Sequence, residues 1–294
     1  MDQYKRMKPS CSPVQMDAGI MAAKALTPAI FRLDLEAPEM ASIIRPGQFL
    51  MIRPTWGDDP LLGRPLAVYD VLRGSSGEAI GLSVVYQVFG RGTTRLSQLS
   101  AGDKVRIWGP LGHPFEATPP RGDLWFVAGG IGYTPFLALA KWWMGQEQYG
   151  ESVDRDQPAC RIDFLYGVRH AGLLPPLDEF RASGMHLELC TEDGSVGAKG
   201  RITDLMTQKL NGPPNARPAL IVACGPEPML AAVSKWSQGH GIKCLVSLEN
   251  QMACGFGACF SCVAPIIQAD GSVDLRRVCL EGPIFDGSLV DWHF

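Results

Sequence analysis

The spacing of apolar positions divides the chain into stretches of different character. From residue 20 to about residue 116, short apolar-rich runs are separated by Gly and Pro, which is typical of strands in a small antiparallel barrel. These runs cover residues 30–35, 48–52, 66–69, 80–88 and 104–108. We expect residues 1–20 to form a poorly ordered tail.

A second pattern begins after the Pro- and Gly-containing stretch at residues 118–122. Wholly apolar runs, typical of buried parallel strands, alternate there with helical stretches such as 135–147 and 227–238. The apolar runs are 124–128, 162–166, 187–190, 220–223 and 243–246. This alternation predicts a doubly wound α/β domain with about five parallel strands. A Cys- and Gly-rich unit follows, so we predict domains at 20–118, 119–246 and 247–294.

Composition narrows the class of protein. The net charge is −3, which argues against nucleic acid or an anionic membrane as the main partner. Hydrophobic residues make up 46% of the chain, which is enough to fill a core. Gly and Pro interrupt both of the long uncharged runs, so we expect no membrane span. No apolar segment follows the basic start, so we expect no secretory signal. Nine cysteines then indicate reduced thiols or metal ligands in the cytoplasm.

Four cysteines near the end of the chain carry the strongest chemical signal. Cys254, Cys259, Cys262 and Cys279 form the pattern C-x4-C-x2-C-x16-C. This spacing is that of a plant-type [2Fe–2S] site, whereas zinc sites favour two close C-x2-C pairs. Small neighbours, including Gly255 and Gly257, allow backbone N–H groups to approach the sulfur atoms. The alternative interpretation is a four-cysteine zinc site in a non-catalytic interaction module.

Two glycine-rich turns follow predicted buried strands. Gly130 and Gly132 lie in the turn that opens the helix predicted from residue 135, and Gly225 and Pro226 lie in a corresponding turn after residue 223. Exposed N–H groups at the start of a helix suit a pyrophosphate, and ligands of such sheets bind outside the carboxyl ends of the strands. A simple tight turn is the alternative, since neither turn has the G-x-G-x-x-G pattern.

The predicted barrel contains a candidate anion site. Arg64 could pair with a phosphate, while Gly92 and Thr93 could offer backbone and hydroxyl donors. A solvated arginine and an ordinary hairpin turn explain the same residues equally well.

The order of these motifs resembles the ferredoxin–NADP reductase superfamily. In chain order they are Arg64-Pro65-Leu66-Ala67, Gly109-Pro110-Leu111-Gly112, Gly129-Gly130-Ile131-Gly132 and Cys224-Gly225-Pro226-Glu227-Pro228-Met229. The ending resembles the electron-transfer subunits of NAD-dependent dihydroorotate dehydrogenases through Ser247-Leu248-Glu249, Met252-Ala253-Cys254-Gly255 and Arg277-Val278-Cys279-Leu280-Glu281-Gly282-Pro283. The resemblance covers residues 20–294.

The resemblance implies an FAD-binding barrel, an NAD-binding α/β domain and a small [2Fe–2S] domain. FAD would be lined by Arg64, Pro65, Leu66, Ala67, Val85, Tyr86, Gln87, Gly92 and Thr93. Ala67 departs from the superfamily, which usually has Ser or Thr there with a hydroxyl near the flavin N5. NAD(H) would lie on Gly130, Gly132, Gly225 and Pro226, with Cys224 and Glu227 beside the nicotinamide. An acid stabilised by the helix dipole is the alternative for Glu227.

The cofactors also follow from electron counting. NADH gives up a hydride, whereas a [2Fe–2S] cluster passes one electron at a time, so a flavin is needed between them. The resemblance implies a heterotetramer, with two copies of an FMN-containing catalytic subunit that oxidises dihydroorotate in pyrimidine synthesis. Its electrons would pass through the cluster and FAD to NAD+.

Two further alternatives remain open. The chain could be a flavin/iron–sulfur subunit for another acceptor, as in ferredoxin–NADP reductase or a sulfide dehydrogenase-like complex. The choice of NAD over NADP rests on Glu192 and Asp193, whose charges would repel a 2′-phosphate, although Arg169 or Lys199 could compensate.

Overall fold

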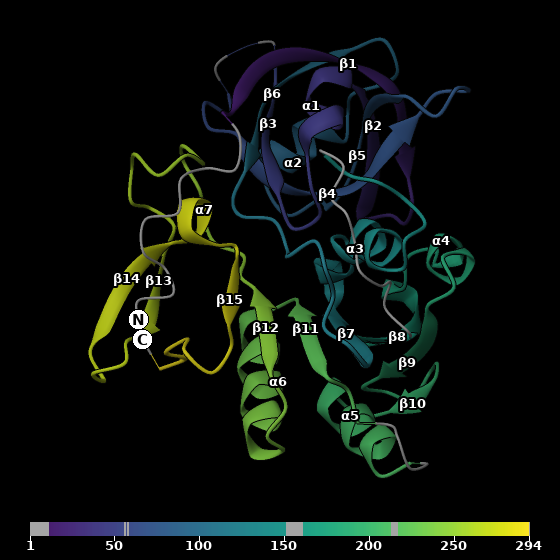
Figure 1. The fold of residues 1–294 in the computed structure, drawn as a ribbon. Helices are drawn as coiled ribbons and strands as arrows, with labels where there is room; N and C mark the ends of the chain where they lie inside the picture. Colours follow the sequence, from purple (N-terminus) through teal and green to yellow (C-terminus); the bar gives the residue numbers. More distant parts are fainter. Residues whose placement is uncertain (1–11, 56, 58, 151–160, 213–216, 294) are drawn as a thin grey trace.

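The structure is a computed structural model that describes residues 12–55, 57, 59–150, 161–212 and 217–293. Its first part is a closed antiparallel barrel with strand order β1-β2-β5-β4-β3-β6, as the sequence predicts (Figure 1). The strands are β1 (Val14–Ala25), β2 (Ile30–Glu36), β3 (Phe49–Pro54), β4 (Arg64–Arg73), β5 (Ala79–Gln87) and β6 (Lys104–Leu111). Two short helices, α1 (Pro38–Ile43) and α2 (Arg91–Leu96), lie in the connections.

The start of the barrel corrects the prediction of a tail over residues 1–20 from Val14 onward, and residues 1–11 of that prediction lie outside the described residues. Strand β1 begins at Val14 and pairs with both β2 and β6. Its inward side chains include Ala18 and Ile20, which are almost fully buried. The alternation was hard to see because its buried positions are partly small residues, which give a weak apolar signal.

The second part is a seven-stranded sheet with the order β10-β9-β8-β7-β11-β12-β15. The strands are β7 (Asp123–Gly129), β8 (Arg161–Val168), β9 (His186–Thr191), β10 (Ala198–Lys199), β11 (Leu220–Cys224), β12 (Cys244–Ser247) and β15 (Ile284–Asp286). All neighbouring pairs are parallel except β12 with β15. The predicted parallel sheet is confirmed, and it gains the two-residue strand β10.

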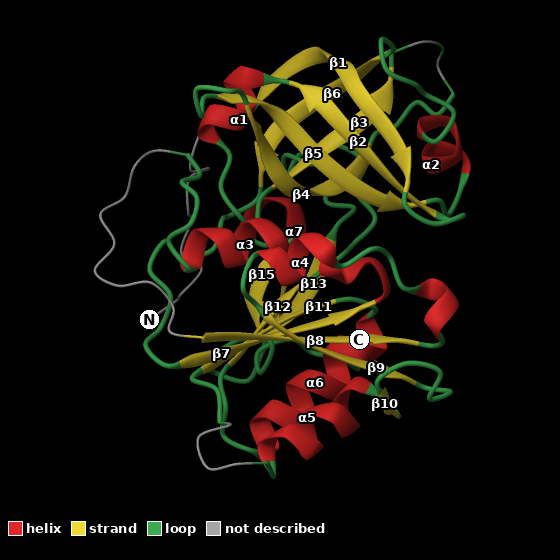
Figure 2. Ribbon diagram, turned by 90° about the vertical axis from the view of Figure 1, so that its right-hand side faces the viewer, coloured by secondary structure: helices red, strands yellow, loops and turns green. Residues whose placement is uncertain are grey.

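Helices cover both faces of this sheet (Figure 2). They are α3 (Phe136–Trp143) and α4 (Asp178–Ala182) on the side of the barrel, and α5 (Ile202–Leu210) and α6 (Glu227–Gly239) on the other side. Short 3-10 turns cover Gly130–Tyr133 and Ala171–Leu173. The helix predicted over 135–147 ends at Trp143, because Gly145 takes a φ of 75° that is incompatible with a continuing helix.

The C-terminal segment leaves the sheet and then returns to it. After β12 it forms the cysteine-containing loop, the hairpin β13 (Val263–Ile267) and β14 (Val273–Arg277), and the short helix α7 (Val278–Glu281). Strand β15 then pairs with β12. The third unit is therefore joined to the sheet through hydrogen bonds, and the domain limits at residues 118 and 246 stay predictions.

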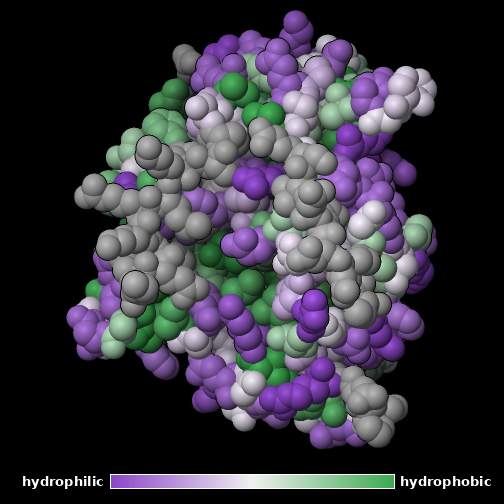
Figure 3. All heavy atoms as spheres, in the orientation of Figure 1, coloured by the Kyte–Doolittle hydropathy of each residue, from purple (hydrophilic) through white to green (hydrophobic). Residues whose placement is uncertain are grey.

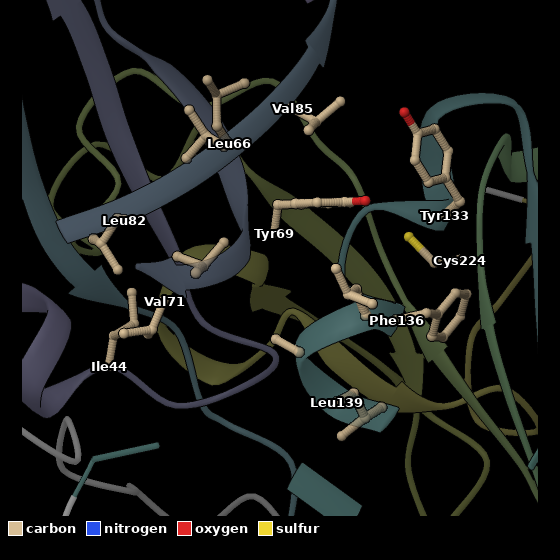
Figure 4. Close-up of a cluster of buried hydrophobic side chains, with 14 of the residues drawn as sticks. Ile44, Leu66, Tyr69, Val71, Leu82, Val85, Tyr133, Phe136, Leu139 and Cys224 are labelled. Atoms are coloured by element: carbon tan, nitrogen blue, oxygen red, sulfur yellow. The ribbon is translucent and has the colours of Figure 1, made fainter. Parts of the chain in front are cut away.

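Two hydrophobic cores hold the three parts together. One joins the barrel interior to the sheet face that carries α3, where side chains such as Leu66 and Phe136 belong to the same cluster (Figure 4). The other joins the opposite sheet face to the cysteine unit and includes Trp125 and Cys279. Figure 3 shows apolar residues set back from the surface between the barrel and the sheet. Among the described residues, no helix has the length and apolar character needed to cross a bilayer.

We predict that Phe126→Ala lowers stability by about 3–5 kcal/mol, because it leaves a cavity in the core. Phe126 is fully buried on β7 and stacks on Phe136 with ring centroids 4.8 Å apart. Thermal melting measures the effect, with Val273→Ala as the control because Val273 is 45% exposed on β14. Equal melting temperatures for both variants would contradict the assigned core.

Candidate functional site

The four motif cysteines come from three neighbouring segments of the C-terminal unit. Cys254 and Cys259 lie in the loop after β12, Cys262 immediately precedes β13, and Cys279 lies in α7. Their thiols interact as two pairs, Cys254 with Cys259 and Cys262 with Cys279. Cys262 and Cys279 are buried, Cys254 is partly buried and Cys259 is exposed. The motif cysteines thus form two thiol pairs within one small unit, and the Cys259 sulfur is at the surface.

Hydrogen bonds favour the ionised form of two of these thiols. The Ser261 hydroxyl lies 3.2 Å from the Cys259 sulfur and lowers the pKa of that thiol to about 6. A hydrogen bond from the Cys279 thiol lowers the pKa of Cys262 to about 6. Because iron and zinc are both bound by thiolates, these environments suit metal ligation.

The backbone between the cysteines fits a two-iron cluster. Gly255 and Gly257 have φ values of 81° and 85°, in the left-handed region that favours glycine, so the loop turns sharply between Cys254 and Cys259. In the described part of the chain, no three His, Cys, Asp or Glu side chains gather closely enough to hold a single metal ion. A plant-type [2Fe–2S] cluster takes four cysteine ligands, and the loop and α7 supply them as two thiol pairs.

The cysteine loop is fastened to the barrel. The Trp108 indole on β6 donates a hydrogen bond to the Cys254 carbonyl over 2.9 Å. A Cβ at Gly255 would lie 2.6 Å from Met51 on β3, and one at Gly63 would lie 2.5 Å from the Trp108 ring. The indole therefore lies between the residue preceding Arg64 and the first cysteine of the cluster motif.

The candidate anion site in the barrel brings Arg64 and α2 together. A Cβ at Gly92 would lie 2.6 Å from the Arg64 Nε, so the guanidinium rests directly on the glycine. Arg64 also donates hydrogen bonds to the carbonyls of Leu62 and Gly63, each over 3.0 Å. The Thr93 hydroxyl donates to the Gly90 carbonyl over 3.1 Å, so it is engaged within its own turn.

The other predicted flavin residues lie on two adjacent barrel strands. Pro65, Leu66 and Ala67 are on β4, and Val85, Tyr86 and Gln87 are on β5. The side chains of Leu66, Val85 and Tyr86 are in the core, those of Pro65 and Ala67 are partly buried, and Gln87 is exposed.

The buried Tyr86 hydroxyl has no hydrogen-bond partner within the described residues. An unpaired buried hydroxyl carries a desolvation cost that a polar atom of a bound cofactor would offset. The glycine under Arg64 and this hydroxyl are both consistent with a flavin nucleotide on this side of the barrel.

The two glycine-rich turns meet at the carboxyl edge of the sheet. A Cβ at Gly132 would lie 2.3 Å from the Cys224 carbonyl oxygen, and one at Gly225 would lie 2.9 Å from the Gly129 carbonyl oxygen. Gly130 has a φ of 55° and nothing within 4 Å of its Cβ position, so this backbone is open to a ligand. Pro226 directly precedes α6. Only glycine permits the two turns to approach this closely.

A carboxyl group beside Cys224 was missed in the sequence. Glu249 lies two residues after β12, whose Ser247 pairs with Cys224 on β11. Its side chain reaches solvent, yet desolvation by the surrounding protein raises its pKa. Burial, together with the nearby charge of Glu249, raises the pKa of the Cys224 thiol. Glu227 is exposed in the first turn of α6.

The signal that could have identified Glu249 is its position. It follows a strand adjacent to the one that ends in Cys224, and neighbouring parallel strands end at the same edge.

The acidic turn after β9 is partly engaged with itself. The Asp193 carboxylate accepts hydrogen bonds from the Ser195 backbone over 2.9 Å and from its hydroxyl over 2.6 Å, which lowers the pKa of Asp193. A Cβ at Gly194 would lie 3.1 Å from the Lys199 side chain, so a lysine adjoins the same turn. Glu192 is exposed there.

Two known families match two separate parts of the chain. Residues 126–235 match the oxidoreductase NAD-binding domain, and residues 249–291 match the iron–sulfur cluster binding domain of dihydroorotate dehydrogenase B. The second match contains all four motif cysteines and begins at Glu249.

Solved structures share the architecture. A structure of NADH-dependent reduced ferredoxin-NADP oxidoreductase is 27% identical, with a TM-score of 0.77 over 94% of this chain and 90% of that chain. The ferredoxin NADP+ reductase of Neisseria gonorrhoeae with bound FAD and NADP is 17% identical, with a TM-score of 0.59 over 77% and 92% of the two chains, and shares the fold.

Similar curated proteins are electron transfer subunits of dihydroorotate dehydrogenase B (NAD(+)). That of Desulforamulus reducens is 31% identical and covers 94% of this chain and 98% of its own. That of Clostridium acetobutylicum is 36% identical and covers 83% of this chain and 85% of its own. The chain therefore belongs to the family of dihydroorotate dehydrogenase B electron transfer subunits.

Proposed function

We propose that this chain carries electrons from an FMN-containing dihydroorotate dehydrogenase subunit, through its own [2Fe–2S] cluster and FAD, to NAD+ in pyrimidine synthesis. The observation that carries the proposal is the placement of the cysteine loop on the barrel. Trp108 joins the Cys254 carbonyl to the barrel, close to the strand that begins at Arg64. A cluster held there would lie beside a flavin held by β4.

The barrel residues fit the FAD role in different ways. Arg64 and the Gly92 backbone would hold the phosphates, while β4 and β5 would support the ring system through Pro65, Ala67 and backbone groups. FAD supplies the exchange between two-electron and one-electron chemistry when bound. Ala67 has no hydroxyl to donate to the flavin, so a backbone amide or another group would have to donate the hydrogen bond near N5.

The sheet edge would hold NAD(H) against the flavin. Gly130, Gly132 and Gly225 would let the dinucleotide approach the backbone, with Pro226 setting the start of α6. Cys224, with Glu249 near it and Glu227 in the first turn of α6, would border the nicotinamide. The neutral Cys224 thiol, favoured by burial, would pack against the ring without adding charge.

The partner would meet the chain at the cysteine loop and complete a heterotetramer with two copies of each subunit. Cys259 is exposed, and the neighbouring Phe256 and Phe260 rings are 54% and 60% exposed.

All seven described cysteines are free thiols, which fits a reducing cytoplasm.

A second candidate function has one observation in its favour. The NADH-dependent reduced ferredoxin-NADP oxidoreductase structure aligns with almost the whole chain. A related role here would be to serve a ferredoxin or another acceptor in place of a dihydroorotate-oxidising subunit.

The isolated chain tests both roles. It is expected to reduce an artificial dye with NADH and to leave dihydroorotate unchanged, and addition of the FMN-containing subunit should bring dihydroorotate-dependent NAD+ reduction. Reduction of ferredoxin, with no response to that subunit, would favour the second candidate. A colourless sample that contains zinc would exclude both.

We predict that Cys259→Ser abolishes the cluster but leaves FAD bound, because this thiol is exposed and its loss does not open a core cavity. Iron and acid-labile sulfide should fall to background while NADH-dependent dye reduction by the flavin persists. The matched control is Cys244→Ser, a buried cysteine on β12 outside the motif, which should retain its iron. Full iron content in Cys259→Ser would refute the ligand assignment.

We predict that Gly132→Ala raises the KM for NADH about 10-fold, which corresponds to ~1.4 kcal/mol, because the added Cβ pushes the two turns apart. FAD and iron contents should not change. Gly239→Ala is the control, since nothing lies within 4 Å of its Cβ position. An unaltered KM in Gly132→Ala would show that dinucleotide binding does not use this turn.

A further inference from the structure

The barrel and the sheet are joined directly by one stretch of chain, between the end of β6 at Leu111 and the start of β7 at Asp123. Their relative orientation is therefore set by non-covalent contacts. If NADH is to react with a flavin on the barrel, this orientation decides how closely the two rings approach. The polar contacts across the joint are accordingly of functional interest.

Two adjacent residues of β4 make several of these contacts, and Arg73 at the end of the same strand also donates to the Gln148 carbonyl. Tyr69 and Asp70 lie where the register between β4 and β5 shifts, between Val68 and Asp70. Such a bulge re-aims side chains and is common beside active sites. Tyr69 is two residues beyond Ala67, or about 7 Å along the strand. The strand expected to carry the flavin is thus also the strand that contacts the sheet domain.

Tyr69 reaches α4. Its hydroxyl donates a hydrogen bond to the Glu179 carboxylate over 2.7 Å, and Arg32 on β2 donates to the same carboxylate over 2.9 Å. Although partial burial raises the pKa of Glu179, the hydrogen bonds from Tyr69 and Arg32 lower it overall. The Arg32 guanidinium also lies 5.5 Å from the Tyr69 ring centroid. An ionised Glu179 therefore receives two donors from the barrel at once.

This contact continues into the nucleotide turn. The Tyr69 ring meets the Tyr133 ring edge-on, with ring centroids 6.5 Å apart (Figure 4). Both rings also pack on Phe180, the residue after Glu179. Tyr133 directly follows Gly132, whose backbone touches Cys224. A continuous set of packed groups thus runs from Glu179 through Tyr69 and Tyr133 to the turns expected to hold NAD(H).

Asp70 makes a second, independent connection to the sheet domain. Asp70 is 9% exposed. Its carboxylate accepts a hydrogen bond from the Tyr149 hydroxyl over 2.7 Å and forms an ion pair with Lys141 on α3. The two connections diverge from neighbouring positions on β4. Loss of the more exposed one, at Glu179, would leave Asp70, together with the contacts of Arg73 to Glu147 and Gln148, to hold the domains together.

We propose that Glu179 is a positioning residue, which through Tyr69 and Tyr133 fixes the distance and angle between the nicotinamide and the flavin. This inference rests on the proposed function, since it requires NADH to react with a flavin on the barrel. Electrostatic stabilisation by a half-exposed pair is small, so the effect should be on geometry rather than on stability. Glutamine at this position would offer one carbonyl oxygen to two donors, and one barrel contact would be lost.

The test uses Glu179→Gln in the holoprotein, with anaerobic rapid mixing against NADH. We expect the rate of flavin reduction to fall about 10- to 100-fold, as misplacement of reacting groups does, with little change in the KM for NADH. The long-wavelength charge-transfer absorbance of the flavin with bound nucleotide should weaken in parallel. Tyr69→Phe, which keeps the ring but removes the donor, should act in the same direction.

Glu188→Gln is the matched control, because Glu188 pairs with Lys209 within the sheet domain and does not touch the barrel. It should keep the parental rate and charge-transfer band. The proposal would be overturned if Glu179→Gln kept the parental rate of flavin reduction and the parental charge-transfer absorbance. It would also be overturned if both variants lost the same fraction of the rate in proportion to a fall in their melting temperatures. If NADH fails to reduce the flavin of the parent protein, the proposed function itself fails, which is a distinct result.

Discussion

The Trp108 indole holds the first cysteine of the cluster motif against the barrel, and the rest of the account depends on this contact. Single electrons move between centres only when those centres are close. A cluster unit that moved away from the barrel could therefore not exchange electrons with a flavin bound there. The glycines on either side of the indole are what make the contact possible. Larger residues at Gly63 or Gly255 would collide with Trp108 or Met51.

Close backbone packing is also found at the carboxyl edge of the sheet, where NAD(H) is expected to bind. Gly132 and Gly225 allow two turns from different strands to touch backbone to backbone, and Cys224 lies at that contact. The joint between barrel and sheet then relies on side chains, with Tyr69 and Asp70 reaching across from a single bulged strand. Close backbone packing therefore shapes each site, while polar side chains set how the sites face one another.

Local patterns in the sequence were sufficient for the strands of the barrel and the sheet, whereas the assignment of the cluster ligands stays a prediction. The barrel strands, the parallel strands and the C-x4-C-x2-C-x16-C motif depend on residues near one another in the chain, and the structure places the four cysteines in one small unit. The tail prediction was wrong from Val14 onward because small buried residues such as Ala18 give little apolar signal.

Contacts between distant residues could not be predicted from the sequence. Tyr69 and Glu179 are 110 residues apart, and no local pattern brings them together. The sequence shows Glu249 only as part of a family motif. Its proximity to Cys224 depends on the pairing of β11 with β12, which the sequence does not show. For the predicted flavin residues, the alternation of β4 and β5 determines which side chains face the core, and a motif alone does not show this.

The most direct measurement is electron paramagnetic resonance of the chain alone after anaerobic addition of excess NADH. The flavin absorbance should bleach and the signal of a reduced [2Fe–2S] cluster should appear, because a cluster at the cysteine loop would lie beside a flavin on β4. A bleached flavin beside a cluster that stays oxidised and silent would contradict it.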